Sequence, residues 1–205
     1  MSIYSKRDEI TREKEERRMS YELPEIYIVI SQTGTLFSRA LKVATRHPYN
    51  HVSISLDREL NAMYSFARRN IYCPWIAGFI EENPDEGMFK IKTQTRCQVY
   101  KLPLTPKQYE QLLLALDPFL KNPEQYRYNF LGLPFIWMGI PLNRRYHFVC
   151  SEFVAHLLMQ VNIIRESHSG RMMRPYDFSM IEDVELIYEG YLREYTNDQE
   201  EYVVF

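Results

Sequence analysis

A cysteine stands where an apolar, extended segment gives way to a helical pattern in YHFVCSEFVAHLL, residues 146–158. If a helix begins at Cys150, the apolar residues after it form one stripe, and Cys150 lies on the same side. The free N–H groups and the positive dipole of a helix N-terminus favour a thiolate, and they can also hold an oxyanion. Two interpretations are open: a nucleophile, or a buried structural thiol of the kind common in protein cores.

A thiol nucleophile needs a base, and His51 is the best placed of the five histidines. In HVSISL, residues 51–56, apolar residues alternate with His51 and two serines. The pattern predicts a strand opening a β-hairpin, with the imidazole on a polar, solvent-connected face. His156 follows Cys150 by six residues, about 120° around the helix, and cannot reach it. His51 and Cys150 are therefore the candidate pair.

Metal and phosphate sites are not indicated. HPYNH, residues 47–51, has the spacing of half a zinc site, but the chain has no paired Cys-x-x-Cys, and Pro48 disrupts a helical spacing of the two histidines. No glycine-rich phosphate loop is found. We expect neither a metal nor another cofactor.

Composition narrows the class of protein. With 205 residues, 45% hydrophobic and 14% aromatic, the chain can build a single core. A net charge of −2 gives no reason to expect nucleic-acid binding. Three scattered cysteines, no secretory signal and no apolar run of roughly 20 residues predict a cytoplasmic protein with reduced thiols and no membrane span. The apolar stretch 130–142, interrupted by Pro134, is expected to be core or pocket wall, with an interfacial lipid contact as the alternative.

The chain is predicted to form a charged N-terminal arm or helix, residues 1–20, and one domain, residues 21–205. Thr105 followed by Pro106 is typical of a helix N-terminus. Residues 73–87 have the composition of a loop. Further strands are expected at 26–30, 88–92, 97–102 and 184–195, and helices at 35–47, 106–121 and from 150 onward.

Two of these segments carry a resemblance. YNHVSISL, residues 49–56, followed about a hundred residues later by FVCSEFVAHLL, resembles the permuted branch of the NlpC-like papain-fold cysteine hydrolases, the YiiX-like proteins. Lecithin:retinol acyltransferase is a more distant relative of that branch. YNFLGL before the cysteine and RPYDF after it extend the resemblance to roughly residues 25–180. It implies an α+β, papain-like fold with an antiparallel sheet packed against helices, Cys150 as nucleophile and His51 as base.

The family also implies a third polar residue, on the next strand, that orients the histidine. No His, Glu or Asp stands at the expected place. A three-residue turn at 57–59 would pair His51 with Ser65, which is our first choice, with Asn61 and Tyr64 as substitutes if the register slips. The N–H of Cys150 or Ser151 would hold the oxyanion.

The predicted reaction is hydrolysis or acyl transfer at an amide or ester, with a peptide, isopeptide or lipid acyl group as substrate. The missing acidic residue supports an alternative, a catalytically weak or inactive papain-like binding module. The sequence leaves the oligomeric state open.

Overall fold

The computed structural model describes residues 23–32, 48–70, 73, 75–132, 135, 138, 140, 142, 144–165 and 172–195. The predicted N-terminal arm, residues 1–20, and the predicted helix at 35–47 lie outside the described residues.

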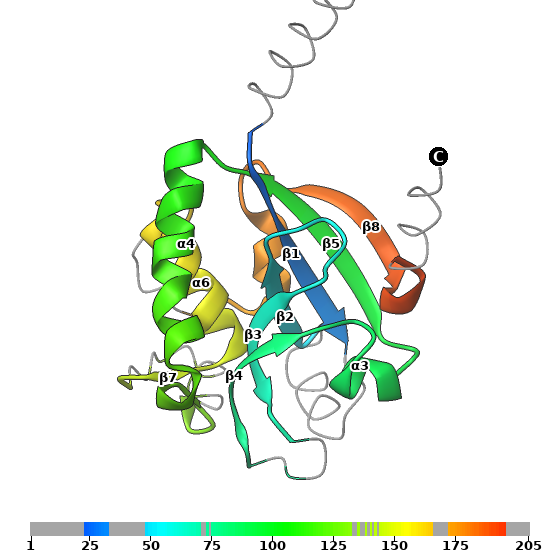
Figure 1. The fold of residues 1–205 in the computed structure, drawn as a ribbon, viewed down its shortest axis with the longest axis vertical. Coiled ribbons are helices and arrows are strands. Elements are labelled where there is room, and N and C mark those ends of the chain that lie inside the picture. The colour runs from blue at the N-terminus through cyan, green and yellow to red at the C-terminus, as the bar shows by residue number, and fades with distance from the viewer. Residues whose placement is uncertain are drawn as a thin grey trace, which may run out of the picture.

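The described chain forms an eight-stranded sheet in the order β7-β6-β4-β3-β2-β1-β5-β8 (Figure 1). Neighbouring strands are antiparallel except β6 and β7, which are parallel. The α+β class is confirmed, but the sheet is mixed rather than wholly antiparallel. The strands are β1 (Glu25–Gln32), β2 (His51–Ser55), β3 (Met63–Arg68), β4 (Ala77–Glu82), β5 (Arg96–Pro103), β6 (Arg127–Tyr128), β7 (His147–Phe148) and β8 (Glu185–Tyr191).

Helices α4 (Pro106–Lys121) and α6 (Cys150–Gln160) pack against each other on one side of the sheet (Figure 1). They bury the alternate apolar residues of the central strands and a group of phenylalanine rings. This is the larger core and it includes Cys150. The remaining helical segments are α3 (Gly87–Ile91), η1 (Pro123–Gln125) and η3 (Pro175–Met180).

The second face of the sheet is also covered. Val29, Cys97 and Val99 pack there with Leu192 and Tyr195, which follow β8. As a result all five residues of β2 are buried. His51 is itself only 7% exposed, so the prediction that its imidazole would lie on a solvent-connected face is wrong.

Both main helices begin where the sequence predicts. Thr105 accepts a hydrogen bond from the Gln108 N–H at 3.3 Å, and its own N–H donates to the Gln108 side chain at 2.9 Å. This reciprocal pair, with Pro106 next in the chain, fixes the start of α4. The helix α6 begins at Cys150.

Three segments differ from their predictions. Residues 88–92 were predicted to form a strand, but most of them lie in the short helix α3. Phe89 is the one buried residue of this helix, so the apolar residues of the segment do not line a buried strand face. The predicted loop 73–87 contains β4, which pairs with all six residues of β3. In the predicted core segment 130–142, Leu131, Met138 and Ile140 are exposed, so that prediction is wrong for these three.

The hairpin register is also corrected. Ser55 pairs with Met63 and Ile54 with Tyr64, two residues away from the predicted pairing. The turn is longer than three residues because Asp57 accepts a hydrogen bond from the Asn61 N–H at 2.9 Å. Leu60 adopts a φ of 59° there and is fully buried.

Candidate active site

Cys150 is the first residue of α6, which packs against β2 and β3. Its residue exposure is 6%, so the thiol is largely enclosed. In any α-helix the N–H groups of the first turn have no acceptor within the helix. At this helix those groups belong to Cys150 and the residues just after it, so the thiol is the side chain nearest to the positive end of the dipole.

His51, the first residue of β2, is held by a carboxylate. Its Nε2 lies 2.9 Å and 3.1 Å from the two carboxylate oxygens of Glu82. The Ser53 hydroxyl donates to the same carboxylate at 2.6 Å and lies 3.3 Å from Nε2. The side chains of His51 and Glu82 are each only 9% exposed. The imidazole is therefore anchored through Nε2 inside the protein.

Glu82 is the residue that sequence reasoning missed. It ends β4, directly opposite Met63 of β3, which is itself opposite Ser55 of β2. Because successive residues of a strand alternate between faces, this alignment puts Glu82 on the face that carries His51 and Ser53. A strand at 77–82 in place of the predicted loop would have supplied the acidic third residue.

The pKa of His51 is raised well above its ordinary value. Burial alone would lower it, but the negative charge of Glu82, hydrogen bonds with Cys150 and Glu82, and the charge of a Cys150 thiolate all favour the imidazolium. Because the Cys150 side chain contributes to the raised pKa of His51, the two predicted residues are neighbours in the structure. The arrangement is thus a buried thiol, imidazole and carboxylate in sequence.

The other predicted site residues lie elsewhere. The Ser65 hydroxyl donates to the Val52 carbonyl at 2.8 Å, so Glu82 and not Ser65 is the partner of His51. Asn61 is in the hairpin turn, where its amide donates to Asp57 at 3.1 Å. Tyr64 stacks on Phe79 with ring centroids 6.2 Å apart. Neither Asn61 nor Tyr64 takes the orienting position.

Ser151, the predicted oxyanion residue, is buried in the first turn of α6. The same turn is braced by Glu152, whose carboxylate accepts from the Val149 N–H at 2.8 Å and from the Asn129 amide at 3.5 Å. Burial raises the pKa of Glu152, while these two hydrogen bonds lower it. Asn129 also holds Gly132, whose N–H donates to it at 3.1 Å.

Tyr128 borders the thiol. It pairs with Phe148, two residues before Cys150, across β6 and β7. Burial raises the pKa of Tyr128 well above its ordinary value, and the charges of Cys150 and Glu152 raise it further, while Arg68 lowers it. The phenol therefore stays neutral and keeps a proton to donate.

Among the residues that the structure describes, the other thiols and imidazoles are set apart from this site. Burial raises the pKa of Cys97 to about 12, and Cys73 is partly exposed in the segment between β3 and β4. His147 contacts the Arg145 carbonyl at 2.8 Å, and His156 lies against the rings of Phe119 and Phe148.

In the part of the chain that the structure describes, no group of three or more His, Cys, Asp and Glu side chains is arranged to hold a metal ion. No helix there is long and apolar enough to cross a membrane.

Comparison of the chain with protein-family models, with curated proteins and with solved structures finds no match.

Proposed function

We propose that the protein is a cysteine hydrolase or acyltransferase that acts on an amide or ester through Cys150 and His51, with Glu82 orienting the histidine. The observation that carries this proposal is the buried pair of His51 and Glu82, 2.9 Å apart, together with Cys150 at a helix N-terminus, whose side chain contributes to the raised pKa of His51. A nucleophile, a base and a group that orients the base are the parts that such chemistry requires. The resemblance to permuted NlpC-like hydrolases and their papain-like fold supports the same assignment.

The first half of the reaction transfers the acyl group to sulfur. Nε2 of His51 is engaged by Glu82, which leaves Nδ1 to face Cys150 and hold its proton. The thiolate attacks the carbonyl carbon, a C–S bond forms, and the carbonyl oxygen becomes an oxyanion. The Nδ1 proton then passes to the leaving nitrogen or oxygen as its bond to carbon breaks. An acyl-thioester at Cys150 remains.

The second half releases the acyl group. His51, now neutral, takes a proton from water or from another hydroxyl or amine acceptor, which attacks the thioester carbon. The C–S bond breaks, and the sulfur leaves as the thiolate that pairs again with the imidazolium. Water gives a carboxylic acid, whereas another acceptor gives a new ester or amide.

In this mechanism the first turn of α6 stabilises the oxyanion. The N–H of Cys150 or Ser151 is in position by virtue of the helix start, and the neutral phenol of Tyr128 is a further donor beside the thiol. Because Cys150 and Ser151 are buried, little water competes for their N–H groups. The substrate class remains an acyl amide or ester of a peptide, an isopeptide or a lipid.

The alternative, an inactive binding module, was motivated by the lack of an acidic third residue. Glu82 supplies an acidic residue next to His51, so it argues against this alternative. Burial of a carboxylate costs free energy, and here the carboxylate is hydrogen-bonded to both His51 and Ser53.

Trapping of the acyl-enzyme tests the proposal. The protein is mixed with p-nitrophenyl esters and with aminoacyl and fatty-acyl coumarin amides, quenched in acid, and analysed by intact mass and peptide mapping. We expect a single acyl addition on Cys150 that is absent in Cys150→Ala and unchanged in Cys73→Ala. Turnover that persists in Cys150→Ala would contradict the proposal.

A further inference from the structure

Arg68 lies at the end of β3, on the face of the sheet against which α6 packs. It follows Phe66 by two residues, and the Phe66 ring lies 5.3 Å from the rings of Phe148 and Phe153. Because residues two apart in a strand share a face, Arg68 lies on the same side as these rings. It is only partly exposed, yet no carboxylate of a described residue forms an ion pair with it.

The strand register places Arg68 in line with Tyr128. Arg68 pairs with Ala77 of β4, and Gly78 of β4 pairs with Arg127 of β6. Both ladders are antiparallel, so the next step of the second ladder sets Ala77 opposite Tyr128. Residues that oppose each other share a face, and Arg68, Ala77 and Tyr128 therefore form a row across three strands. The outer two Cα atoms are roughly 10 Å apart, and the small Ala77 side chain between them leaves room for the arginine to extend toward the phenol.

The row continues to the thiol. Tyr128 pairs with Phe148, two residues before Cys150. The Asn129 N–H donates to the Phe148 carbonyl at 3.0 Å and holds β6 beside the segment that enters α6. The positive charge of Arg68 lowers the pKa of Tyr128, whereas the charge of Cys150 raises it, so both groups lie near the phenol. Arg68 is thus a cation in the neighbourhood of the candidate nucleophile.

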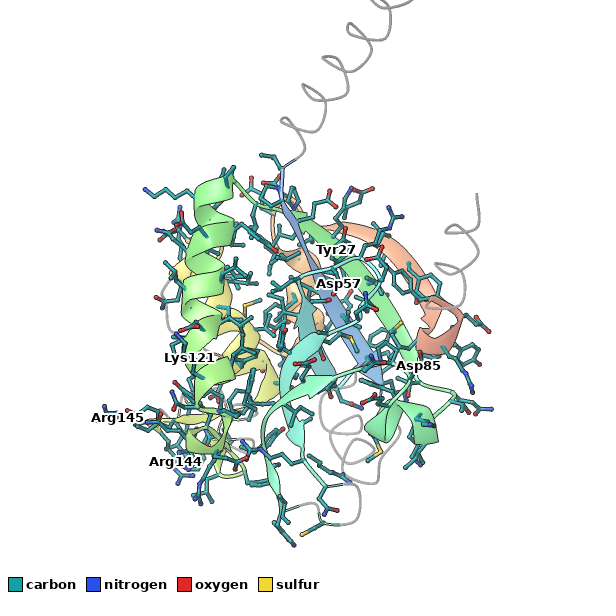
Figure 2. All side chains as sticks on the ribbon, viewed as in Figure 1. Tyr27, Asp57, Asp85, Lys121, Arg144 and Arg145 are labelled. Atoms are coloured by element: carbon teal, nitrogen blue, oxygen red, sulfur yellow. The ribbon has the colours of Figure 1, made fainter. Side chains whose placement is uncertain are left out.

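Two arginines of neighbouring segments are already engaged. The Arg69 guanidinium pairs with the Glu124 carboxylate. The Arg145 guanidinium lies 4.8 Å from the centre of the Tyr146 ring, and Figure 2 shows Arg145 at the outer edge of the molecule. Arg68, in contrast, has its charge available for a ligand.

We propose that Arg68 binds a carboxylate on the acyl group of the substrate, so that the preferred acyl donor is an acidic peptide or isopeptide and not a neutral lipid ester. A guanidinium binds a carboxylate through two parallel hydrogen bonds, and partial burial strengthens them. The thiol keeps the acyl group after the leaving group departs, so a cation beside the thiol faces that part of the substrate. This inference rests on the proposed function for its substrate, but the anion site itself can be tested without turnover.

Alkylation of the full chain by iodoacetate and by iodoacetamide tests the anion site. The two reagents are similar in size and differ in charge, so the ratio of their rate constants at one thiol cancels the nucleophilicity of that thiol. We expect the ratio of iodoacetate to iodoacetamide to be about fivefold or more higher at Cys150 than at Cys73, because Arg68 attracts the carboxylate. Arg68→Gln should remove most of this difference, and Arg68→Lys should keep part of it.

Arg127→Gln is the matched control. It removes the same charge next to Tyr128 in the chain, but on the opposite face of β6, and should leave the ratio unchanged. The inference is overturned if Cys150 and Cys73 give the same ratio, or if Arg68→Gln keeps the difference. It is also overturned if Arg127→Gln lowers the ratio as much as Arg68→Gln does, since a general field and not a binding site would then act on the reagent.

Substrate preference tests the class of acyl donor. Acetyl-glutamyl and acetyl-glutaminyl coumarin amides have nearly the same shape and differ in charge, and kcat/KM should favour the glutamyl amide roughly tenfold or more. Arg68→Gln should lose this preference, and Arg68→Glu should favour the acetyl-lysyl amide instead. Equal cleavage of the glutamyl and glutaminyl amides by the wild type would overturn the inference and leave the acyl transfer standing. Failure to cleave any of the amides, with the alkylation ratio as expected, would contradict the proposed function and not the anion site.

Discussion

The carboxylate of Glu82 gives His51 a charged partner in a site that is closed to most solvent. It accepts from Nε2 at 2.9 Å and from the Ser53 hydroxyl at 2.6 Å, so two donors fix its orientation. An imidazole held in this way presents its other nitrogen to the thiol in one direction only. At this scale the activity should depend on the charge of Glu82, not merely on its size.

Replacement of Glu82 by Gln is expected to lower kcat/KM on the order of 10²-fold, because the base loses the group that orients and stabilises its protonated form. The largest contribution that raises the His51 pKa is lost as well. The alkaline limb of the pH–rate profile, where the imidazolium deprotonates, should therefore move to lower pH. Glu81→Gln changes the neighbouring, exposed carboxylate and should leave both quantities unchanged.

The stability of the protein should report the same His51 pKa. Because that pKa is higher in the folded protein than in the unfolded chain, protonated His51 favours the folded state. The stabilisation is complete below the unfolded pKa of about 6.5 and is lost as pH rises through the folded pKa.

This pH dependence is measured in Cys150→Ala, which has no thiolate and still has Glu82. Its Tm should fall with rising pH above about pH 6.5 more than the Tm of Cys150→Ala with His51→Gln. Parallel curves for the two proteins would show that the pKa of His51 is not raised.

Single residues of the site were only partly predictable. Cys150 lies in a sequence pattern that predicts a helix start, and His51 lies in an alternating pattern that predicts a strand; the structure has both elements. Glu82 stands in AGFIEE, between two prolines, where a glycine and two glutamates obscure the strand pattern. Its role depends on the pairing of β3 with β4, which no local signal specifies.

The first turn of α6 is the element on which the nucleophile depends. The Glu152 carboxylate accepts from the Val149 N–H at 2.8 Å and places negative charge at the positive end of the helix dipole. Glu152→Ala should lower the free energy of unfolding by about 1 kcal/mol and also lower kcat, since Cys150 would lose its fixed position.

Thr105→Ala is the matched control for that effect. It removes the cap of α4, far along the chain from Cys150, and should lower the free energy of unfolding by about 1 kcal/mol with kcat unchanged. Chemical denaturation and initial rates on both variants separate loss of stability from loss of positioning. Equal kcat values for the two variants would exclude a positioning role for Glu152.

Among the elements, prediction succeeded where end signals and periodicity agreed. The helices α4 and α6 have caps or clear apolar stripes, and both begin at the predicted residue. It failed at residues 88–92, where alternation over five residues is too short to distinguish a strand from a single helical turn. The predicted length of the hairpin turn was wrong, because the Asn61 N–H donates to the Asp57 side chain and the turn is longer than three residues.

On the scale of the whole molecule, aromatic packing fixes α6 on the sheet. The Phe66 ring of β3 lies 5.3 Å from the rings of both Phe148 and Phe153, and 6.0 Å from that of Phe79. Phe66→Ala should lower the free energy of unfolding by about 3–5 kcal/mol, a large share of the total for one domain. Leu114→Ala, at an exposed position, should change it by less than about 0.5 kcal/mol in the same urea titration.

The order of the strands could not be read from the sequence. The apolar run of β1 and the alternating residues of β2 indicate strands, but not that β5 pairs on the other side of β1, or that the chain after β8 packs on Val29 and Cys97. These features depend on contacts between distant parts of the chain. The burial of His51, and its contact with the Glu82 carboxylate that raises its pKa, are therefore properties of the assembled fold.

The rate of alkylation of each cysteine by iodoacetamide at about pH 6, followed by peptide mapping, tests the central claim most directly. If His51 holds Cys150 as a thiolate, Cys150 should react at least about tenfold faster than Cys73, although Cys73 is the more exposed, and His51→Gln should remove the difference. Cys97, with its pKa raised to about 12 by burial, should react slowest. A Cys150 that reacts no faster than Cys73, and does so equally in His51→Gln, would contradict the account.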